Sequence, residues 1–188
     1  MAKEIEIKVL DIIPNQLRKL LLDAGAKQDQ KLTKQMRYVF DIDPRDKSKW
    51  IRLRTIGTTT TLAVKVINSA EIDGTHEYET EVADPDNTLS ILEQMGFQPK
   101  SYQENYRESY ILNGASVSID YWPKLKPYLE IEATDKAKIE SVIKSLHLNQ
   151  HKTTSENTKH LYLDIGIDLD KSERLVFNKD EEELIVRY

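Results

Sequence analysis

Short stretches of this chain alternate charged and apolar residues with a period of two, and this pattern constrains the fold more than any other feature. One stretch is Glu4-Ile5-Glu6-Ile7-Lys8, and another is Glu130-Ile131-Glu132. Successive side chains of a β-strand point to opposite faces, so Glu4, Glu6 and Lys8 share one face. Two glutamates on that face lie roughly 6–7 Å apart and repel each other unless a positive group lies between them. The pattern predicts strands with one apolar and one charged face.

The same alternation recurs in the strands predicted between these two stretches. The charges on one face are mostly of one sign, whereas solvent-facing strands usually mix threonine, serine, glutamine and lysine. These faces carry Arg52 and Arg54; Thr61, Ala63 and Lys65; Glu77, Glu79 and Glu81; and Ser116, Ser118 and Asp120.

Two architectures fit such strands. In an ordinary sandwich, the apolar faces form the core and the charged faces meet water. In a closed barrel, helices cover an apolar outer wall and the lumen is charged. The same-sign clusters favour the barrel, as do three predicted amphipathic helices that need apolar sheet surface to cover. The sequence therefore predicts an α+β fold, with a closed antiparallel β-barrel around a charged lumen and helices packed on the outside.

The three helices are predicted from apolar residues at helical spacing. The first covers residues 14–24 and stops at Gly25. The second begins at Asp84-Pro85, a capping residue followed by proline, and stops at Gly96. The third begins near Asp135.

An internal repeat links residues 4–40 with residues 77–111 at an offset of about 70 residues. Each segment runs through a Glu-x-Glu strand, a helix, a glycine and a strand with an arginine, Arg37 in the first and Arg107 in the second. The repeat suggests two related halves. No linker rich in proline, glycine or serine separates them, so a single domain over residues 1–188 is expected.

Composition argues against several classes of protein. The net charge of the 188 residues is −5, whereas a general nucleic-acid or membrane-surface binder needs a cationic field. The chain has no cysteine, which excludes disulfides and thiolate chemistry. Its apolar runs fall short of the ~20 residues of a membrane span. We expect a cytoplasmic monomer or homodimer with no nucleic-acid and no membrane partner.

The proposed inner face carries eight acids and five bases. An acidic surplus away from water is unfavourable unless divalent ions neutralise it. A polyphosphate can then bind the bases and complete the coordination of the metal, and carboxylate and phosphate oxygens suit Mg²⁺ or Mn²⁺. Arginine suits bidentate phosphate recognition. The acids are Glu4, Glu6, Glu77, Glu79, Glu81, Asp120, Glu130 and Glu132, and the bases are Lys8, Arg52, Arg54, Lys65 and Arg107.

In this order, the motifs resemble those of the CYTH-domain family, the triphosphate tunnel metalloenzymes that include class IV adenylyl cyclases and thiamine triphosphatases. The resemblance covers roughly residues 1–165 and leaves a C-terminal extension over residues 169–188. We expect a loop at residues 168–172 and a hairpin or helix from residue 174 onward. The matching motifs are Glu4-x-Glu6-x-Lys8, Trp50-Ile51-Arg52-Leu53-Arg54, Leu62-Ala63-Val64-Lys65, Glu77-Tyr78-Glu79-Thr80-Glu81, Arg107 with Tyr110, Val117-Ser118-Ile119-Asp120 and Glu130-Ile131-Glu132.

The resemblance implies an eight-stranded antiparallel tunnel that binds a triphosphate and a divalent metal, and it implies roles for the charged residues. The metal candidates are Glu4, Glu6, Glu130, Glu132, Asp120 and Glu79. The phosphate-binding candidates are Lys8, Arg52, Arg54, Lys65, Arg107 and, by its place in the repeat, Arg37. The catalytic candidates are Lys8, Glu6 and Asp120. Two plainer interpretations stay open: carboxylates solvated on an exposed strand, and bases paired with glutamates across strands.

The resemblance leaves the reaction open. Our first expectation is metal-dependent hydrolysis of tripolyphosphate, thiamine triphosphate or a nucleoside triphosphate such as ATP. The alternatives are a class IV adenylyl cyclase, which makes cyclic AMP and pyrophosphate from ATP, and a non-catalytic triphosphate-binding protein. One departure keeps the last alternative open, because many family members carry two bases two positions apart where this chain has Asn105 and Arg107.

Overall fold

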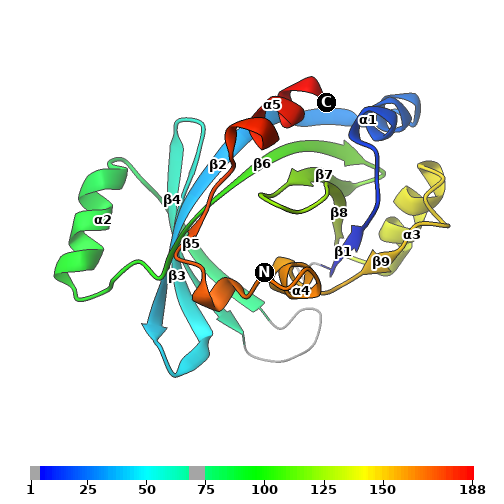
Figure 1. Cartoon of the computed structure of the whole chain (residues 1–188). Coiled ribbons are helices and arrows are strands. Elements are labelled where there is room, and N and C mark those ends of the chain that lie inside the picture. The colour runs from blue at the N-terminus through cyan, green and yellow to red at the C-terminus, as the bar shows by residue number, and fades with distance from the viewer. Residues whose placement is uncertain (1–4, 68–74) are drawn as a thin grey trace. The chain divides into compact units, whose positions relative to one another are not determined.

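The computed structural model describes residues 5–67 and 75–188 (Figure 1), so Glu4 lies outside the described residues. The strands in these ranges are β1 (Ile5–Val9), β2 (Lys27–Asp43), β3 (Asp46–Ile56), β4 (Thr59–Ile67), β5 (Thr75–Val82), β6 (Ser101–Leu112), β7 (Ala115–Tyr121), β8 (Tyr128–Ala133), β9 (Thr153–Thr154) and β10 (Arg174–Leu175). The helices are α1 (Pro14–Asp23), α2 (Pro85–Gln94), α3 (Lys136–Ser145), α4 (Thr158–Asp164) and α5 (Lys179–Arg187).

The strands hydrogen-bond in the order β5-β4-β3-β2-β6-β7-β8-β1-β9, and β10 pairs with β6 in parallel. The pairs β1–β8, β2–β3, β3–β4, β4–β5, β6–β7 and β7–β8 are antiparallel. The predicted α+β fold with an antiparallel sheet is confirmed. Among the described strands the path is open and ends at β5 and β9, so the closed eight-stranded barrel stays a prediction. The two-residue strands β9 and β10 were not predicted.

The predicted repeat is visible in the order of the elements. The sequences β1-α1-β2 and β5-α2-β6 correspond, and each helix is followed by a glycine, Gly25 with φ +79° and Gly96 with φ +92°. This left-handed conformation is the one that favours glycine after a helix. In the sheet, β3, β4 and β5 follow outward from β2, as β7, β8 and β1 follow outward from β6. The two halves of the repeat thus supply corresponding strands in corresponding order.

The chain divides into two compact units. The β1 unit comprises Met1–Thr33, Tyr106–Leu169 and Phe177–Tyr188, and the β3 unit comprises Lys34–Asn105 and Asp170–Val176. The single domain over residues 1–188 stays a prediction.

The core of the β1 unit lies on the apolar face of its strands. Buried β-strand residues such as Val117 and Ile131 belong to one apolar cluster that also includes residues of α1, α3 and α5. The helices contribute Leu17, Val142 and Ile185, respectively, to the same cluster. This arrangement confirms, within the unit, that helices cover the apolar face predicted from the alternation.

The core of the β3 unit is smaller. Phe40, Ile51 and Leu53 form it with Leu92 of α2, and Leu62 is half-buried against them. The apolar face of β2, β3 and β4 is therefore the face that α2 covers.

All three predicted helices are present; the predicted cap at Asp84 is confirmed, and Asp135 caps the third helix as well. The side chain of Asp84 accepts a hydrogen bond from the backbone N–H of Asn87 at 2.9 Å, and Asp135 accepts one from Lys138 at 3.0 Å. These contacts satisfy backbone donors that the first turn of a helix leaves unpaired.

The C-terminal segment differs in part from its prediction. The expected loop contains a single 3-10 turn at Leu169–Lys171. The helix alternative for the last residues is confirmed by α5, which begins with a capping box between Asn178 and Glu181. The seven-residue helix α4 was not predicted.

Candidate functional site

The charged face of the β1 unit is built by four neighbouring strands. In the register between β1 and β8, Glu6 lies opposite Glu132 and Lys8 lies opposite Glu130. Opposite residues of an antiparallel pair share a face, so the predicted Glu-x-Glu-x-Lys and Glu-x-Glu motifs meet. Ser116 and Ser118 of β7 continue the same rows from Glu132 and Glu130, and Arg107 of β6 lies opposite Asp120.

Arg107 binds two carboxylates on this face. Its Nε and Nη2 donate to the two oxygens of Asp120 at 2.8 and 2.7 Å, and Nη2 donates to Glu130 at 2.7 Å. Asp120 is fully buried. Burial by itself lowers the pKa of Arg107, but the charges of Asp120 and Glu130 outweigh this effect, and the pKa lies well above its usual value. The bidentate contact fixes the plane of the guanidinium.

Lys8 is 2% exposed and also lies between two carboxylates. Its Nζ donates to Glu6 and lies 3.6 Å from an oxygen of Glu130. Partial burial and the neighbouring charge of Glu130 raise the pKa of Glu6. Burial also acts to raise the pKa of Glu130, but Arg107 and Lys8 more than offset it, and this pKa is lowered. Glu130 therefore keeps its charge more readily than Glu6, whose charge it disfavours.

One end of this face is covered by α4. Tyr128 lies opposite Asp120, is 2% exposed, and shares a hydrogen bond of 3.1 Å between its hydroxyl and the Thr158 hydroxyl at the start of α4. The hydroxyl of Tyr162 in α4 donates to the carbonyl of Pro123 at 2.7 Å. The sequence analysis did not predict that α4 covers this end of the face. Strand alternation does place Tyr128 on the same face as Glu130, two residues further on.

The other end of the face opens into a cavity of about 330 Å³, whose lining includes Ser116 and Glu132. Pockets for small molecules start near this size. Glu132 therefore lies at a solvent-accessible opening of the β1 unit.

A second charged face lies in the β3 unit. Arg52 donates to Glu77 at 2.5 Å and to Glu79 at 3.1 Å, and Arg54 donates to Glu79 at 3.2 Å. Lys65 lies 3.1 Å from Glu77. Burial, with Arg52 nearby, lowers the pKa of Lys65. Burial acts to raise the pKa of Glu79, but Thr61, Arg54 and Arg52 together lower it. The cross-strand pairing that the sequence left open is therefore present in this unit.

Arg37 joins this second face. It lies directly opposite Arg54 in the register of β2 and β3. Its Nη2 donates to the side-chain oxygens of Asn105 and, at 3.4 Å, of Gln35. Arg37 therefore shares a face with Arg54, and its role in phosphate binding stays a prediction.

The predicted metal ligands are distributed over different surroundings. Glu4 lies outside the described residues, Asp120 is bound by Arg107, and Glu79 binds bases in the β3 unit. Within residues 5–67 and 75–188, no three histidine, aspartate or glutamate side chains converge as a metal site. Glu6, Glu130 and Glu132 share the face of the β1 unit, and their roles as ligands stay a prediction.

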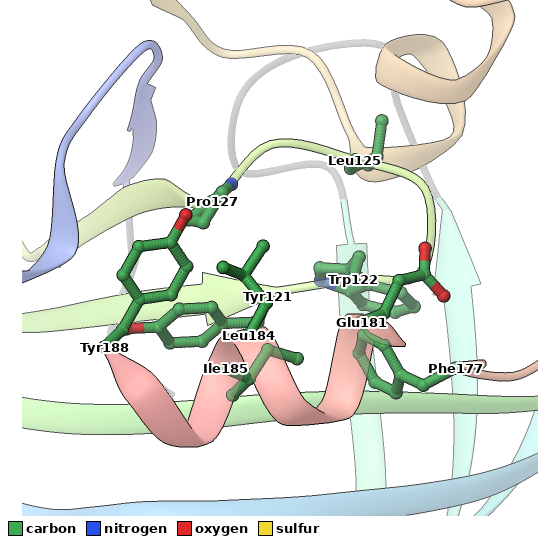
Figure 2. A pocket seen from close by; sticks show the side chains of 9 residues that line it. All are labelled: Tyr121, Trp122, Leu125, Pro127, Phe177, Glu181, Leu184, Ile185 and Tyr188. Atoms are coloured by element: carbon green, nitrogen blue, oxygen red, sulfur yellow. The ribbon is translucent and has the colours of Figure 1, made fainter. Parts of the chain in front are cut away.

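A further cavity lies outside both charged faces. Figure 2 shows it beside α5, where Tyr121, Trp122, Phe177 and Tyr188 are among the lining residues. Its volume of about 60 Å³ is well below the roughly 300 Å³ at which pockets for small molecules start. This cavity is too small for a triphosphate.

Comparisons with known proteins place the chain among its relatives. The family model for the CYTH domain matches residues 2–161. A conserved hypothetical protein from Pyrococcus furiosus is similar in structure, with a TM-score of 0.69 and 21% identity, over 82% of this chain and 97% of that chain. A putative adenylate cyclase from Vibrio parahaemolyticus has a TM-score of 0.67 and 14% identity, over 87% of this chain and 98% of that chain.

A putative adenylyl cyclase from Hippeastrum, described as having a dominant triphosphatase activity, has a TM-score of 0.59 and 17% identity, over 92% of this chain and 100% of that chain. At these identities the likeness concerns the fold. No curated protein matches the sequence. None of the helices in the described ranges is long and apolar enough to cross a membrane.

Proposed function

Because the chain belongs to the CYTH domain family, we propose that it is a divalent-metal-dependent enzyme that hydrolyses an inorganic or organic triphosphate. Tripolyphosphate, thiamine triphosphate and nucleoside triphosphates are the candidate substrates. The closed tunnel predicted from the sequence is part of this proposal. The Hippeastrum protein with a dominant triphosphatase activity supports placing hydrolysis ahead of cyclisation.

One observation carries the proposal: the two bases on the face of the β1 unit, Lys8 and Arg107, are each held between two carboxylates. Ion pairs removed from water are costly unless their geometry is good and every group is satisfied. A structural role needs no such concentration of bases and acids on the polar face of a sheet. Phosphate oxygens can replace the carboxylates at the bases, because both are anionic oxygen acceptors that suit arginine and lysine.

The carboxylates that the phosphate oxygens displace then need a positive partner. The carboxylate oxygens on this face suit a divalent cation. Glu6, Glu130 and Glu132 offer oxygen ligands of the kind that Mg²⁺ and Mn²⁺ prefer. Burial and the charge of Glu130 raise the pKa of Glu6, and a nearby cation would lower this pKa again because it stabilises the carboxylate. We propose these three as ligands, with Glu4, Asp120 and Glu79 completing the predicted set. When bound, the metal would neutralise phosphate charge and acidify a water molecule.

The residues of the chain itself bind and orient the substrate. Asp120 holds both nitrogens of one edge of Arg107, so the guanidinium presents a fixed fork to a phosphoryl group. Lys8 lies buried within reach of Glu6 and supplies a point charge to a phosphoryl oxygen. In this proposal Lys8, Glu6 and Asp120 are the catalytic residues, because phosphoryl transfer depends on positioning and charge neutralisation.

The β3 unit supplies further bases. Arg52, Arg54, Lys65 and Arg37 are proposed to bind phosphate oxygens. The buried Nε of Arg52 has no hydrogen-bond partner within the described residues, and a buried donor without an acceptor is costly. An anionic oxygen at this nitrogen would satisfy it.

Product analysis tests the proposed function. The protein is incubated with tripolyphosphate and with ATP, each with Mg²⁺ or Mn²⁺, and we expect inorganic phosphate that disappears with EDTA. Cyclic AMP with pyrophosphate would establish the cyclase alternative instead, and binding without products would establish the non-catalytic one.

A matched pair of variants links the activity to the site. Lys8→Met is expected to abolish turnover, whereas Lys126→Met is expected to leave it intact. Lys126 is an exposed lysine of the same unit, 84% of whose side chain is accessible. Equal activity in the two variants would contradict the assignment of the site.

A further inference from the structure

Two buried serine hydroxyls form a pair on the charged face of the β1 unit. Ser109 of β6 lies directly opposite Ser118 of β7, and their Oγ atoms are 3.0 Å apart. Ser109 is 8% exposed and Ser118 is 4% exposed. Strand alternation places Ser109 on the face of Arg107 and Ser118 on the face of Asp120, two residues away in each case. The pair therefore belongs to the charged face and not to the apolar core.

The pair holds one more proton than its hydrogen bond uses. Two hydroxyls carry two protons, and a single hydrogen bond between them uses only one. Neither hydroxyl makes another hydrogen bond with the residues that the structure describes, 5–67 and 75–188. A buried donor without an acceptor is costly, and such a group in a native protein needs an explanation. The hydroxyl that accepts the bond can therefore donate its own proton in a hydrogen bond to a ligand.

The neighbour of Ser118 across the sheet indicates where an anionic oxygen would meet this proton. Ser118 lies directly opposite Glu130 of β8, and the Cβ atoms of residues so placed are about 4.5–5.5 Å apart. Both bases of this face reach the Glu130 carboxylate, Nη2 of Arg107 at 2.7 Å and Nζ of Lys8 at 3.6 Å. An anionic oxygen that takes the place of this carboxylate between the two bases would lie close to the Ser118 hydroxyl.

We propose that the Ser118 hydroxyl donates a hydrogen bond to a phosphoryl oxygen of the bound triphosphate, between Arg107 and Lys8, and that Ser109 orients it. In this arrangement Ser109 donates to Ser118, and Ser118 donates to the substrate. This inference rests on the proposed function. Ser118 is then a substrate-binding residue, and Ser109 is a positioning residue that acts only through Ser118.

A neutral donor at this place differs in one respect from the bases beside it. Lys8 and Arg107 are paired with carboxylates, so a phosphoryl group that binds them competes with those acids. The Ser118 hydroxyl has no carboxylate partner within the described ranges, so it can bind a phosphoryl oxygen without displacing an acid. Hydrogen bonds to an ionised acceptor are stronger than neutral ones, and the bond from Ser109 polarises the Ser118 hydroxyl further.

A second hydroxyl pair of the chain provides a matched control. Thr55 of β3 and Thr60 of β4 lie directly opposite each other, and their hydroxyl oxygens are 2.9 Å apart. Strand alternation places this pair with Leu53 and Leu62, on the apolar face of the β3 unit. The two pairs therefore share the same cross-strand contact and differ in the kind of face that carries it.

Four proteins test the proposal beside the wild type: Ser118→Ala, Ser109→Ala, the two combined, and the control with Thr55→Val and Thr60→Val. Binding is measured by calorimetry with Mg²⁺ and the imido analogue of tripolyphosphate, whose bridging NH groups resist hydrolysis. The other measurements are kcat and KM for tripolyphosphate with Mg²⁺, and the melting temperature.

We expect Kd and KM to rise about tenfold in Ser118→Ala, with kcat within about twofold, since a contact that binds the substrate throughout the reaction is lost. Ser109→Ala should raise Kd about threefold, because Ser118 keeps its donor and loses its orientation. The combined variant should match Ser118→Ala, because Ser109 acts through Ser118. Its melting temperature should change little, since no unpaired hydroxyl is left behind. The control should bind as the wild type does.

Several outcomes would overturn the inference and leave the proposed function standing. An unchanged Kd in Ser118→Ala would show that the serine pair is only structural, and an equal rise of Kd in the threonine control would show a general effect of lost hydroxyl pairs. Weaker Mn²⁺ binding by Ser118→Ala in the absence of any triphosphate would show that the hydroxyl serves the metal. Losses that multiply in the combined variant would refute the positioning role of Ser109.

The wild type separates these outcomes from a failure of the proposed function. If it binds no imido analogue and releases no phosphate from any triphosphate, the proposed function fails, and this inference fails with it. Tight binding by the wild type together with equally tight binding by Ser118→Ala refutes this inference alone.

Discussion

A buried ion pair on the helix-covered face of the β1 unit offers a quantitative test of the fold. Glu108 of β6, with 3% of its side chain exposed, points toward α1, where Nε of Arg18 donates to its two oxygens at 2.9 and 3.0 Å. Nη2 of Arg18 lies 2.7 Å from the same carboxylate. The hydroxyls of Tyr110 and Tyr121 also donate to Glu108, at 2.9 and 3.0 Å. All these groups lie on the face opposite to the charged one.

Arg18→Met removes the charge and keeps most of the apolar stem. Removing one partner of a buried pair typically costs about 3–5 kcal/mol, because the other charge stays buried without compensation. The two tyrosine hydroxyls still donate to Glu108, so we expect the lower end, about 3 kcal/mol. At about 2–4 °C per kcal/mol for a chain of this size, the melting temperature should fall by about 6–12 °C.

Urea unfolding and thermal melting at pH 7 measure the loss. Adding Glu108→Gln to Arg18→Met should recover most of it, since glutamine keeps the shape, accepts hydrogen bonds from the tyrosines and carries no charge. Lys126→Met, which breaks the exposed pair between Lys126 and Asp11, should have no measurable effect. The reasoning is refuted if Arg18→Met costs less than about 1 kcal/mol, or if the double variant is as unstable as the sum of the single ones.

Three further predictions follow from the charged faces and from the same buried pair. Glu6→Ala or Glu132→Ala should abolish Mg²⁺-dependent hydrolysis of tripolyphosphate and leave the circular dichroism spectrum unchanged; full activity in both variants would contradict the site. Arg52→Ala should raise KM for tripolyphosphate about tenfold or more, and Arg52→Lys should recover only part of it, because lysine lacks the bidentate fork; equal KM values in all three proteins would count against phosphate binding there. Burial and Glu108 raise the pKa of Tyr110 from 10.0 to about 12. The stability that the protonated hydroxyl of Tyr110 contributes is therefore complete below pH 10 and is lost as the pH rises toward 12. Tyr110→Phe should therefore show a shallower loss of stability in urea titrations between pH 10 and 12, and an equal slope would show that Tyr110 does not cause it.

The charged face of the β1 unit was predictable because strand alternation determines which side chains share a face. Glu6, Lys8, Glu130 and Glu132 are placed together by two short motifs whose apolar neighbours must lie in the core. Alternation could not reveal which acid each base contacts. The preference of Arg107 for Asp120 depends on the register of β6 with β7, which the two-residue turn Asn113-Gly114 sets and alternation alone does not encode.

Glu108 shows where alternation fails. The residues two positions before and after it in the strand are apolar and share its face of the sheet. Its partner Arg18 lies 90 residues away on a helix. A local pattern can indicate that a charge faces the core, but a long-range partner requires the packing of α1 against β6. The cover at Tyr128 was missed for a related reason, since α4 has seven residues and is too short for a clear periodicity.

The two charged faces lead to one constraint on any polyanion that binds. Lys8, Arg107, Arg52 and Lys65 each already contact a carboxylate, so a triphosphate that binds them competes with those acids. A displaced buried carboxylate without a cation costs several kcal/mol, which offsets much of the gain at the bases. A cation that takes over the carboxylates removes this penalty, and it also neutralises the phosphate charge. In the proposed function, metal and triphosphate therefore bind with positive coupling, because each compensates the charge that the other leaves unpaired.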